Sequence, residues 1–439
     1  MRVLSLGLLS LLPAAVFAND AVNDERFWAQ WRGPRMAGIS PNGNPPLEWS
    51  ETKNVAWKKS LPRHGSSTPV IWEDRLYVLT AVPAEGDAVK PDEVGSSRGD
   101  TAAGDGEQIF KVMALRRSDG SVVWERTANR ALPHEGKQQN NSYASGSAVT
   151  DGVHLIAYFG SWGLYCYDLE GKLIWSKDFG TLRTRGGFGE GTSPALFGDT
   201  VVVQWDSEDD SFVVALDKAT GEERWRKSRE EVTSWATPLV VPHAGRMQVI
   251  TTGERRVIGY DLQTGEVIWE GDGLTLNAIP SPVEHGGIVY VTSGFRGNAA
   301  RAIRLADARG DITGTSPAVL WELDRDTPYV PSPLFYEGVL YLLKSNSAIL
   351  TALDAATGRA HYGPVRLEGL SEVYASPTGV NGNVIILGRD GHALVLKNGT
   401  VLTVVARNSL EDGFDASPAI VGNEMYLRGY RHLYKIAAE

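Results

Sequence analysis

Cysteine is almost absent from this chain, since Cys166 is the only one among 439 residues. A single cysteine cannot form an intramolecular disulfide, so no covalent staple is available even in an oxidising compartment. Metal sites built on paired cysteines and the haem-attachment motif Cys-x-x-Cys-His are excluded for the same reason. Cys166 follows Tyr165 in a predicted strand, which predicts a buried and unreactive thiol.

Excess positive charge and long apolar runs are also missing. The net charge is −10, which disfavours nucleic acid and anionic membranes as partners because both need a basic surface. The apolar run Leu4–Leu12 follows Arg2 and precedes Val16-Phe17-Ala18, the pattern of a secretory signal peptide (residues 1–18) cleaved after Ala18. This run is too short for a transmembrane span, although a retained anchor is the alternative. We therefore expect a periplasmic or secreted protein.

What the sequence does contain is a repeated hairpin. In Ser211–Trp225 an apolar run reaches Asp217, turns at Thr220-Gly221 and ends on a tryptophan four residues after the glycine. Such a pattern predicts a β-hairpin. The same spacing recurs in the pairs Gly120 and Trp124, Gly171 and Trp175, Gly265 and Trp269, and Gly358 and Tyr362. Repetition on this scale predicts a repeat protein, and we expect each outer-strand tryptophan to lie across the neighbouring repeat.

A second marker, a small residue before or at a proline, opens an apolar strand in each repeat. Its positions are Pro69, Ala148 (in place of proline), Pro194, Pro238, Pro282, Pro333, Pro377 and Pro418. Proline lacks an N–H group and suits a strand edge, here the innermost strand facing a central channel. Eight units of about 44 residues with four strands each predict an all-β fold, an eight-bladed β-propeller.

The predicted ring closes through its first strand. The last unit ends at Ile436 after three strands, and the isolated strand Asn54–Lys59, which contains Trp57, would supply the missing outer strand. We expect residues 19–53 to form a Trp/Pro-rich leader packed on the propeller of residues 54–439. Residues 82–108 form an acidic insertion, which is either a solvated loop or a lid or docking arm.

The two faces of this ring differ in content. We define the top face as the loops between strands two and three of each blade and the loops joining successive blades; the remaining turns form the bottom face. Bottom-face turns have ordinary turn residues, whereas charged, aromatic and amide side chains gather on the top face. Its candidate ligand-binding residues are His64, His134, Arg183, Arg185, Glu190, Trp235, Asn277, Arg296, Tyr329, Lys344, Tyr374, Arg389, Asp415 and Arg428.

Two of these residues are also candidate catalytic acids or bases. Glu190 lies in a glycine-rich loop immediately before a channel strand, and the alternative is an ion pair with Arg183 or Arg185. Asp415 is placed similarly before Pro418, and its alternative role is to cap a turn.

Four cations occur at comparable places in successive blades: Arg296, Lys344, Arg389 and Arg428. They predict either a cationic ring for an anion or separate ion pairs with acids such as Asp390.

Metal binding has weaker support. His64 and His134 belong to the top face but His243 and His285 to the bottom face, so a four-histidine site is not expected. The acidic run 208–210 lacks the spacing of a known Ca²⁺ loop, and a solvated tip is the other interpretation.

The proline-marked strands and the D-x-x-T-G-x-x-x-W hairpins resemble the repeats of the pyrroloquinoline-quinone (PQQ) dehydrogenase superfamily. Phe27–Pro34, Gly186–Pro194, Ser234–Pro238 and Asp412–Pro418 resemble a secreted branch of PQQ-like propeller proteins. The similarity covers nearly the whole mature chain and also extends to a non-catalytic outer-membrane-assembly lipoprotein.

The resemblance implies two classes of function. One is a monomeric module that binds a protein or a small anionic ligand through its top face. The other is a PQQ-dependent dehydrogenase for alcohols or sugars, with quinone and Ca²⁺ in the channel and Glu190 or Asp415 as base. Many quinoprotein alcohol dehydrogenases have adjacent cysteines, which this chain lacks, and no hydrolase elbow or phosphate loop occurs. The first class is therefore our leading expectation.

Overall fold

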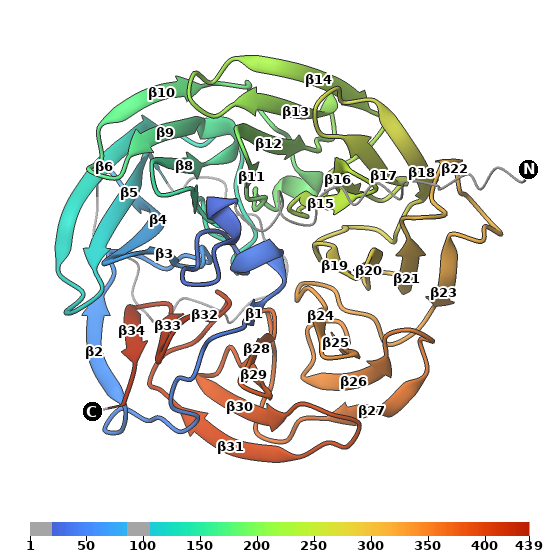
Figure 1. Cartoon of the computed structure of the whole chain (residues 1–439). Coiled ribbons are helices and arrows are strands. Elements are labelled where there is room, and N and C mark those ends of the chain that lie inside the picture. Colours follow the sequence, from blue (N-terminus) through green and yellow to red (C-terminus); the bar gives the residue numbers. More distant parts are fainter. Residues whose placement is uncertain (1–19, 86–105, 439) are drawn as a thin grey trace, which may run out of the picture.

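Eight β-sheets surround a central channel in the computed structural model, which describes residues 20–85 and 106–438 (Figure 1). The prediction of an all-β, eight-bladed propeller with four-stranded blades is confirmed. The predicted signal peptide and most of the insertion lie outside the described residues. No helix in the described part of the chain is long and apolar enough to cross a membrane.

In blades one to seven the strands follow one another in sequence from the channel to the rim. Blades one and two contain β3 (Val70–Trp72), β4 (Arg75–Pro83), β5 (Gln108–Arg116) and β6 (Val122–Ala131), then β7 (Val149–Thr150), β8 (His154–Tyr158), β9 (Leu164–Asp168) and β10 (Leu173–Lys177). Blades three and four contain β11 (Ala195–Phe197), β12 (Thr200–Trp205), β13 (Ser211–Asp217) and β14 (Glu223–Arg229), then β15 (Leu239–His243), β16 (Arg246–Thr252), β17 (Arg256–Asp261) and β18 (Val267–Asp272).

The second half of the ring repeats the arrangement. Blades five and six contain β19 (Val283–His285), β20 (Ile288–Ser293), β21 (Ala299–Arg304) and β23 (Val319–Leu323), then β24 (Leu334–Tyr336), β25 (Val339–Leu343), β26 (Ile349–Asp354) and β27 (Ala360–Arg366). Blades seven and eight contain β28 (Thr378–Val380), β29 (Asn383–Leu387), β30 (His392–Lys397) and β31 (Val404–Ser409), then β32 (Ala419–Val421), β33 (Glu424–Arg428), β34 (His432–Ile436) and β2 (Val55–Ser60).

The eighth blade closes the ring as predicted. β2 pairs antiparallel with β34, from Val55 opposite Ile436 to Ser60 opposite His432. The indole Nε1 of Trp57 donates to the carbonyl of Arg117 in blade one, 3.0 Å away. An early strand therefore completes the last blade and contacts the first.

A ring of hydrogen bonds around the channel explains why a serine or threonine precedes each proline marker. The backbone N–H of this residue donates to the hydroxyl of its counterpart in the next blade. For example, Thr68 N lies 2.9 Å from Ser147 Oγ, and Ser147 N lies 2.9 Å from Ser193 Oγ. The series continues through Thr237, Ser281, Ser332, Ser376 and Ser417. Thr68 Oγ1 then bonds the carbonyl of Ser417 at 3.4 Å, so the series closes on itself.

The interblade tryptophans pair with the hairpin glycines of the next blade. Trp124 Nε1 donates to the carbonyl of Leu169, 2.9 Å away, and its ring lies against Gly171. A Cβ at Gly171 would come within 2.8 Å of the ring, so the repeat needs glycine there. The corresponding glycines of Trp57, Trp175, Trp225 and Trp321 are Gly120, Gly221, Gly265 and Gly358.

Trp269 is an exception, and the prediction that it crosses to the next blade is wrong. Its Nε1 bonds Gln248 of its own blade at 3.0 Å, and its ring lies against Gly259. The cause is the longer connection between β21 and β23. This connection forms β22 (Gly310–Asp311), which pairs with β18 opposite Trp269.

The leader crosses the bottom face, where Figure 1 shows the blue amino-terminal segment over the centre of the ring. It includes the 3₁₀ turns η1 (Ala21–Asn23) and η2 (Pro34–Met36) and the short strand β1 (Ile39–Ser40), which pairs with β28. Trp28 is fully buried and exchanges two backbone hydrogen bonds with Ile71 of blade one. The leader therefore covers the bottom end of the channel.

Two further predictions concern local details. The prediction that Cys166 is buried is confirmed, and burial raises the pKa of its thiol to about 12. The insertion starts later than the sequence predicts because β4 extends to Pro83, where it pairs with Gln108 at the start of β5.

Candidate binding site on the top face

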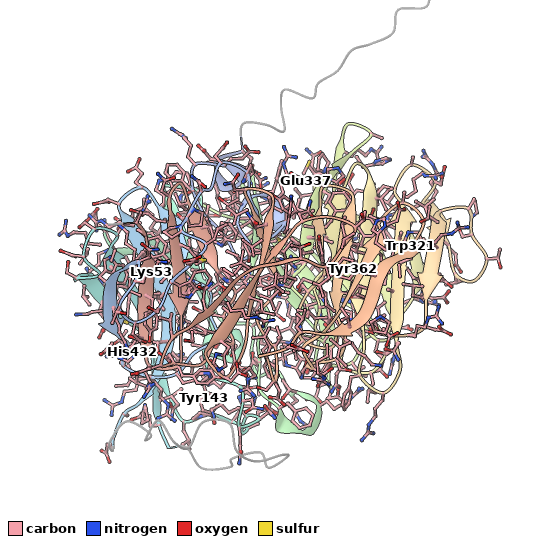
Figure 2. The ribbon with its side chains drawn as sticks, turned by 90° about the horizontal axis from the view of Figure 1, so that it is seen from below. Lys53, Tyr143, Trp321, Glu337, Tyr362 and His432 are labelled. Carbon is pink, nitrogen blue, oxygen red and sulfur yellow. The ribbon has the colours of Figure 1, made fainter. Side chains whose placement is uncertain are left out.

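The top face lies at the end of the ring opposite the leader. Figure 2 shows Tyr143 and His432 at this end and Glu337, in a bottom-face turn, at the other. Two 3₁₀ turns, η4 (Gly160–Trp162) and η5 (Arg185–Gly187), shape the top-face loops of blades two and three. Two groups of residues here contain the candidate acids: the Asp415 cluster and the Glu190 pocket.

The Asp415 cluster consists of His64, Tyr374, Arg389, Asp415 and Tyr430. Arg389 Nε lies 2.7 Å from Asp415 Oδ1, and His64 Nε2 lies 3.5 Å from Asp415 Oδ2. The Arg389 guanidinium also lies 4.1 Å from the centre of the Tyr374 ring. Burial opposes ionisation of Asp415, but the His64 hydrogen bond and the Arg389 charge outweigh it, and the net effect lowers the pKa. Asp415 is thus held as a paired carboxylate, which argues against a role as a base.

Tyr374 connects opposite parts of the top face. Its hydroxyl accepts a hydrogen bond from Asn140 Nδ2 at 3.3 Å, although Asn140 belongs to the loop that joins blades one and two. Tyr430 donates to Asp415 Oδ1 at 3.1 Å. Burial raises the pKa of both tyrosines, so their hydroxyls stay protonated at neutral pH.

The predicted cationic ring does not form among the described residues. Lys344 pairs with Asp326 at 2.8 Å, and Arg389 pairs with Asp415 and Glu372 rather than with Asp390. Arg428 is buried in the wall and donates to backbone carbonyls, including that of Leu79 at 2.8 Å. Arg296 is exposed beside the ring of Phe295. The alternative of separate ion pairs with acids therefore holds for Lys344 and Arg389, whereas Arg428 bonds backbone carbonyls and Arg296 lies beside an aromatic ring.

A third group joins blades three to five. Arg185 Nη1 lies 2.7 Å from Glu254 Oε2 and 3.3 Å from Asn277 Oδ1. Asn277, with a φ of 56°, donates to the hydroxyl of Tyr329 at 3.4 Å. Arg183 is exposed and pairs with Asp209 at 3.3 Å. Both arginines thus have acidic partners, and Glu190 is not among them.

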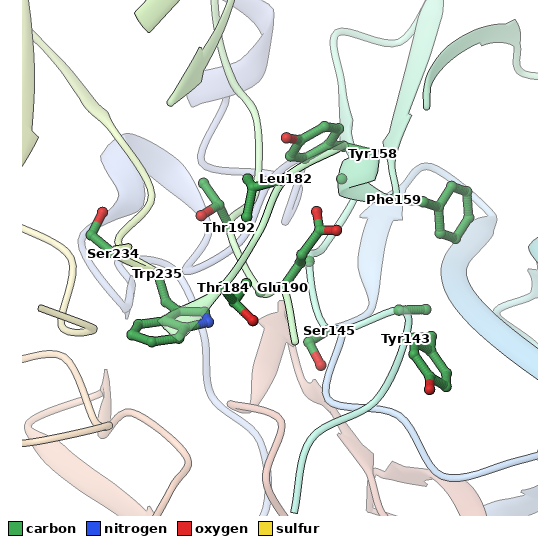
Figure 3. Close-up of a pocket in the computed structure, with 14 residues that line it drawn as sticks. Tyr143, Ser145, Tyr158, Phe159, Leu182, Thr184, Glu190, Thr192, Ser234 and Trp235 are labelled. Carbon is green, nitrogen blue, oxygen red and sulfur yellow. The ribbon is translucent and has the colours of Figure 1, made fainter. Parts of the chain in front are cut away.

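The loop before Glu190 is held by its neighbours. The carboxylate of Glu135 accepts hydrogen bonds from the N–H and hydroxyl of Thr184, whose hydroxyl oxygen accepts from Gly189 N at 3.0 Å. The indole of Trp235 donates to the carbonyl of Gly189 at 2.6 Å. This fixed backbone directs the Glu190 side chain inward, as Figure 3 shows.

Glu190 is partly exposed as a residue, but its carboxylate points inward and has no cationic partner among the described residues. Its Oε2 accepts the backbone N–H of Ser161 at 2.9 Å, while Oε1 is buried with no hydrogen-bond partner in the described part of the chain. Burial raises the pKa of Glu190 to about 8, and the Ser161 hydrogen bonds only partly offset this effect. The predicted alternative of an ion pair with Arg183 or Arg185 is therefore wrong.

The Glu190 carboxylate borders a small cavity, the Glu190 pocket. Its volume of about 20 Å³ admits one water-sized group. It is lined by Tyr143, Ala144, Ser145, Gly146, Tyr158, Phe159, Gly160, Leu182, Thr184, Glu190, Gly191, Thr192, Ser234 and Trp235. Ser145, Gly191, Thr192 and Trp235 are partly exposed and form its mouth, and the other residues except Glu190 are buried.

Sequence reasoning identified Glu190 and Trp235 but missed the floor of this pocket. Tyr158 and Phe159 end an ordinary strand, and nothing in their spacing distinguishes them from core residues. Gly160 is the one visible signal: with a φ of +61°, its Cβ position lies 1.5 Å from Glu190 Oε2. His134 lies beside the pocket, with Nε2 2.8 Å from the carbonyl of Leu182.

These groups do not fit PQQ with Ca²⁺. The Glu190 pocket is too small for a planar quinone. Of the four cations that would hold an anionic ring, Lys344 and Arg389 pair with acids and Arg428 is buried, which leaves Arg296 exposed. Within residues 20–85 and 106–438, no three or more His, Cys, Asp or Glu side chains converge as metal ligands. The acidic run 208–210 is engaged locally: Glu208 accepts from Thr233, and Asp209 pairs with Arg183.

The repeat region is similar to a known family. A family model described as "Outer membrane protein assembly factor BamB" matches residues 109–272 and 163–313. No curated protein matches the chain. The resemblance to PQQ-like β-propeller repeats is therefore confirmed by the family model, and the solved structures support it.

Solved propellers share the fold at low sequence identity. BamB from Moraxella catarrhalis is 13% identical with a TM-score of 0.58, over 86% of this chain and 98% of that chain. The quinohemoprotein alcohol dehydrogenase ADHIIG from Pseudomonas putida HK5 is 12% identical with a TM-score of 0.60, over 96% and 81%. The computationally designed protein Ika8 is 13% identical with a TM-score of 0.57, over 88% and 99%. At these identities the structures show the fold alone.

Proposed function

We propose that this eight-bladed β-propeller, whose repeats are similar to PQQ-like repeats, is an exported recognition module that binds a protein or a small ligand through its top face. The main support is the difference between the two ends of the ring. The leader covers the bottom end, whereas the top face carries the aromatic, amide and charged side chains described above. Rigid scaffolds with varied loops on one face commonly bind partners there.

Further support comes from the relatives. One structural neighbour is BamB, which the family model describes as an outer membrane protein assembly factor. The pattern of residues 1–18 supports export to the periplasm or the outside of the cell with cleavage of a signal peptide. We propose that the exported protein is a monomer. A dehydrogenase is the weaker alternative because the residues at the mouth do not fit PQQ with Ca²⁺.

The test compares the two faces with matched charge changes. Arg183→Ala with Arg296→Ala removes two exposed top-face cations, and Arg246→Ala with Arg309→Ala removes two exposed bottom-face cations. We expect the first pair to reduce partner capture from a periplasmic extract at least about fivefold, the second to leave it unchanged, and neither to move the melting temperature by more than a few degrees. Equal capture by both variants would contradict the assignment of the top face.

A further inference from the structure

The carboxylate of Glu190 has no cationic partner, whereas three other acidic side chains in the described part of the chain each pair with a cation. Asp206 pairs with Arg229 at 2.8 Å, Asp151 with Lys218 at 2.6 Å and Asp415 with Arg389 at 2.7 Å. Glu190 is hydrogen-bonded by Ser161, through its backbone N–H at 2.9 Å and its side chain, and its Oε1 has no partner among the described residues. A buried carboxylate without a partner is unfavourable, and a cation supplied from outside would satisfy it.

The surroundings of Glu190 favour a cation. None of the residues lining the pocket is Lys, Arg or His. The residues that line it include Tyr158 and Trp235, and aromatic faces attract ammonium groups, whereas the ring of Phe159 points away from Glu190 (Figure 3). Lys137 illustrates this preference nearby, because its ammonium lies 5.5 Å from the centre of the Tyr143 ring.

The size and ligand set of the pocket limit the kind of cation. A volume of about 20 Å³ accommodates an ammonium head but no bulky guanidinium or aromatic amine. Calcium takes six to eight oxygen ligands, usually with several carboxylates, whereas this pocket has one carboxylate. The hydroxyls of Ser145 and Thr192 stand at the partly exposed mouth, so an alkyl stem would leave the pocket past them (Figure 3).

We propose that the Glu190 pocket binds a primary ammonium group, carried either by a free small amine or by a lysine side chain of a partner. This inference rests on the proposed function because it makes the pocket one contact of the top face. The ammonium would donate to Glu190 Oε1, which has no other partner among the described residues. Since burial keeps most of Glu190 protonated near pH 7, binding the ammonium ionises the carboxyl group and releases a proton to the buffer.

The test is calorimetric titration of the purified chain at pH 7 with methylamine and, separately, with Nα-acetyl-lysine amide. Two amine-free buffers with different ionisation enthalpies report the proton release. We expect the wild type to bind with proton release, and Glu190→Gln to lose affinity at least about tenfold together with the buffer dependence. The control Glu125→Gln removes an exposed rim acid paired with Lys111 and should bind as the wild type does.

Each outcome has a defined meaning. Tighter binding of the lysine derivative identifies a partner's side chain, and binding of methylamine that is as tight or tighter identifies a free amine. Equal binding by wild type and Glu190→Gln, no binding of either amine, or binding of K⁺ alone would overturn the inference. Loss of partner capture on the Arg183 and Arg296 changes, without amine binding, would overturn this inference and leave the proposed function intact. Amine binding together with unchanged partner capture would contradict the proposed function and leave the ammonium site intact.

Discussion

Glu190 and Asp415 occupy corresponding places in the ring and have opposite surroundings. Each belongs to a loop joining two blades and precedes a proline-marked channel strand, at Pro194 and Pro418. Asp415 has an arginine and a histidine beside it, whereas Glu190 has aromatic rings and hydrogen bonds from Ser161. The neighbouring loops therefore decide whether an acid before a channel strand is a charged structural group or a neutral one facing a cavity.

The largest expected effect comes from making Asp415 resemble Glu190. Arg389→Met removes the guanidinium and leaves a buried carboxylate beside His64 and the Tyr430 hydroxyl, which should cost about 3–5 kcal/mol of unfolding free energy. Urea denaturation at pH 7.5 measures the loss. The double variant Arg389→Met with Asp415→Leu should recover much of it, because no charge remains buried. A loss below about 1 kcal/mol in the single variant would show that the pair is not the main support of this cluster.

The next effect is a difference in pH dependence. The pKa of Glu190 is raised to about 8 in the folded state, whereas an unperturbed Glu has a pKa of about 4.3. Between these two pH values the folded state binds more protons than the unfolded state, so the free energy of unfolding falls as the pH rises. The pKa of Asp415 is lowered in the folded state, so the unfolded state binds more protons. The free energy of unfolding therefore falls as the pH drops below about 3.9, the pKa of an unperturbed Asp. Urea midpoints from pH 3 to 9 should show a decline between pH 5 and 8 that Glu190→Gln removes, on the order of 2–4 kcal/mol. Asp415→Asn should alter only the acidic limb, and equal alkaline slopes in wild type and Glu190→Gln would contradict the unpaired state of Glu190.

The smallest effect concerns the glycine beneath the carboxylate. A Cβ on Gly160 would lie 1.5 Å from Glu190 Oε2, and its φ is +61°. Gly198, with a φ of +59°, has open space at its Cβ position and provides a matched control. Gly160→Ala should cost about 1–2 kcal/mol more than Gly198→Ala, because both carry similar backbone strain but only the first displaces a side chain. Thermal denaturation of the two variants measures the difference, and equal losses would mean that the carboxylate moves aside freely.

Much of the fold could be predicted because its markers are local. The hairpin glycine, the tryptophan four residues later and the proline-marked strand each report a short piece of backbone, and their repetition gave eight blades closed by the strand containing Trp57. Trp269 shows where this reasoning fails: its environment depends on the connection that forms β22, in the following blade.

The sequence predicted which face of the ring carries the candidate site, but not which side chains contact one another there. An ion pair of Glu190 with Arg183 or Arg185 was one of two alternatives because these residues are close in sequence, yet the partner of Arg185 is Glu254, on the next blade but one. Similarly, Arg389 finds Asp415 rather than the adjacent Asp390. Side chains of a propeller mouth meet across blades, and their pairing depends on loop conformations that spacing within one repeat does not report.

The pairing of β2 with β34 has a consequence for biogenesis. The two strands are separated by more than 370 residues, and such distant pairing is typical of slow folding. During synthesis, β2 would emerge first and keep an open edge until its partner at the far end of the chain is made. A polypeptide halted before His432 would lack β34 and leave the edges of β2 and β33 unpaired, with unsatisfied main-chain groups available for association between molecules.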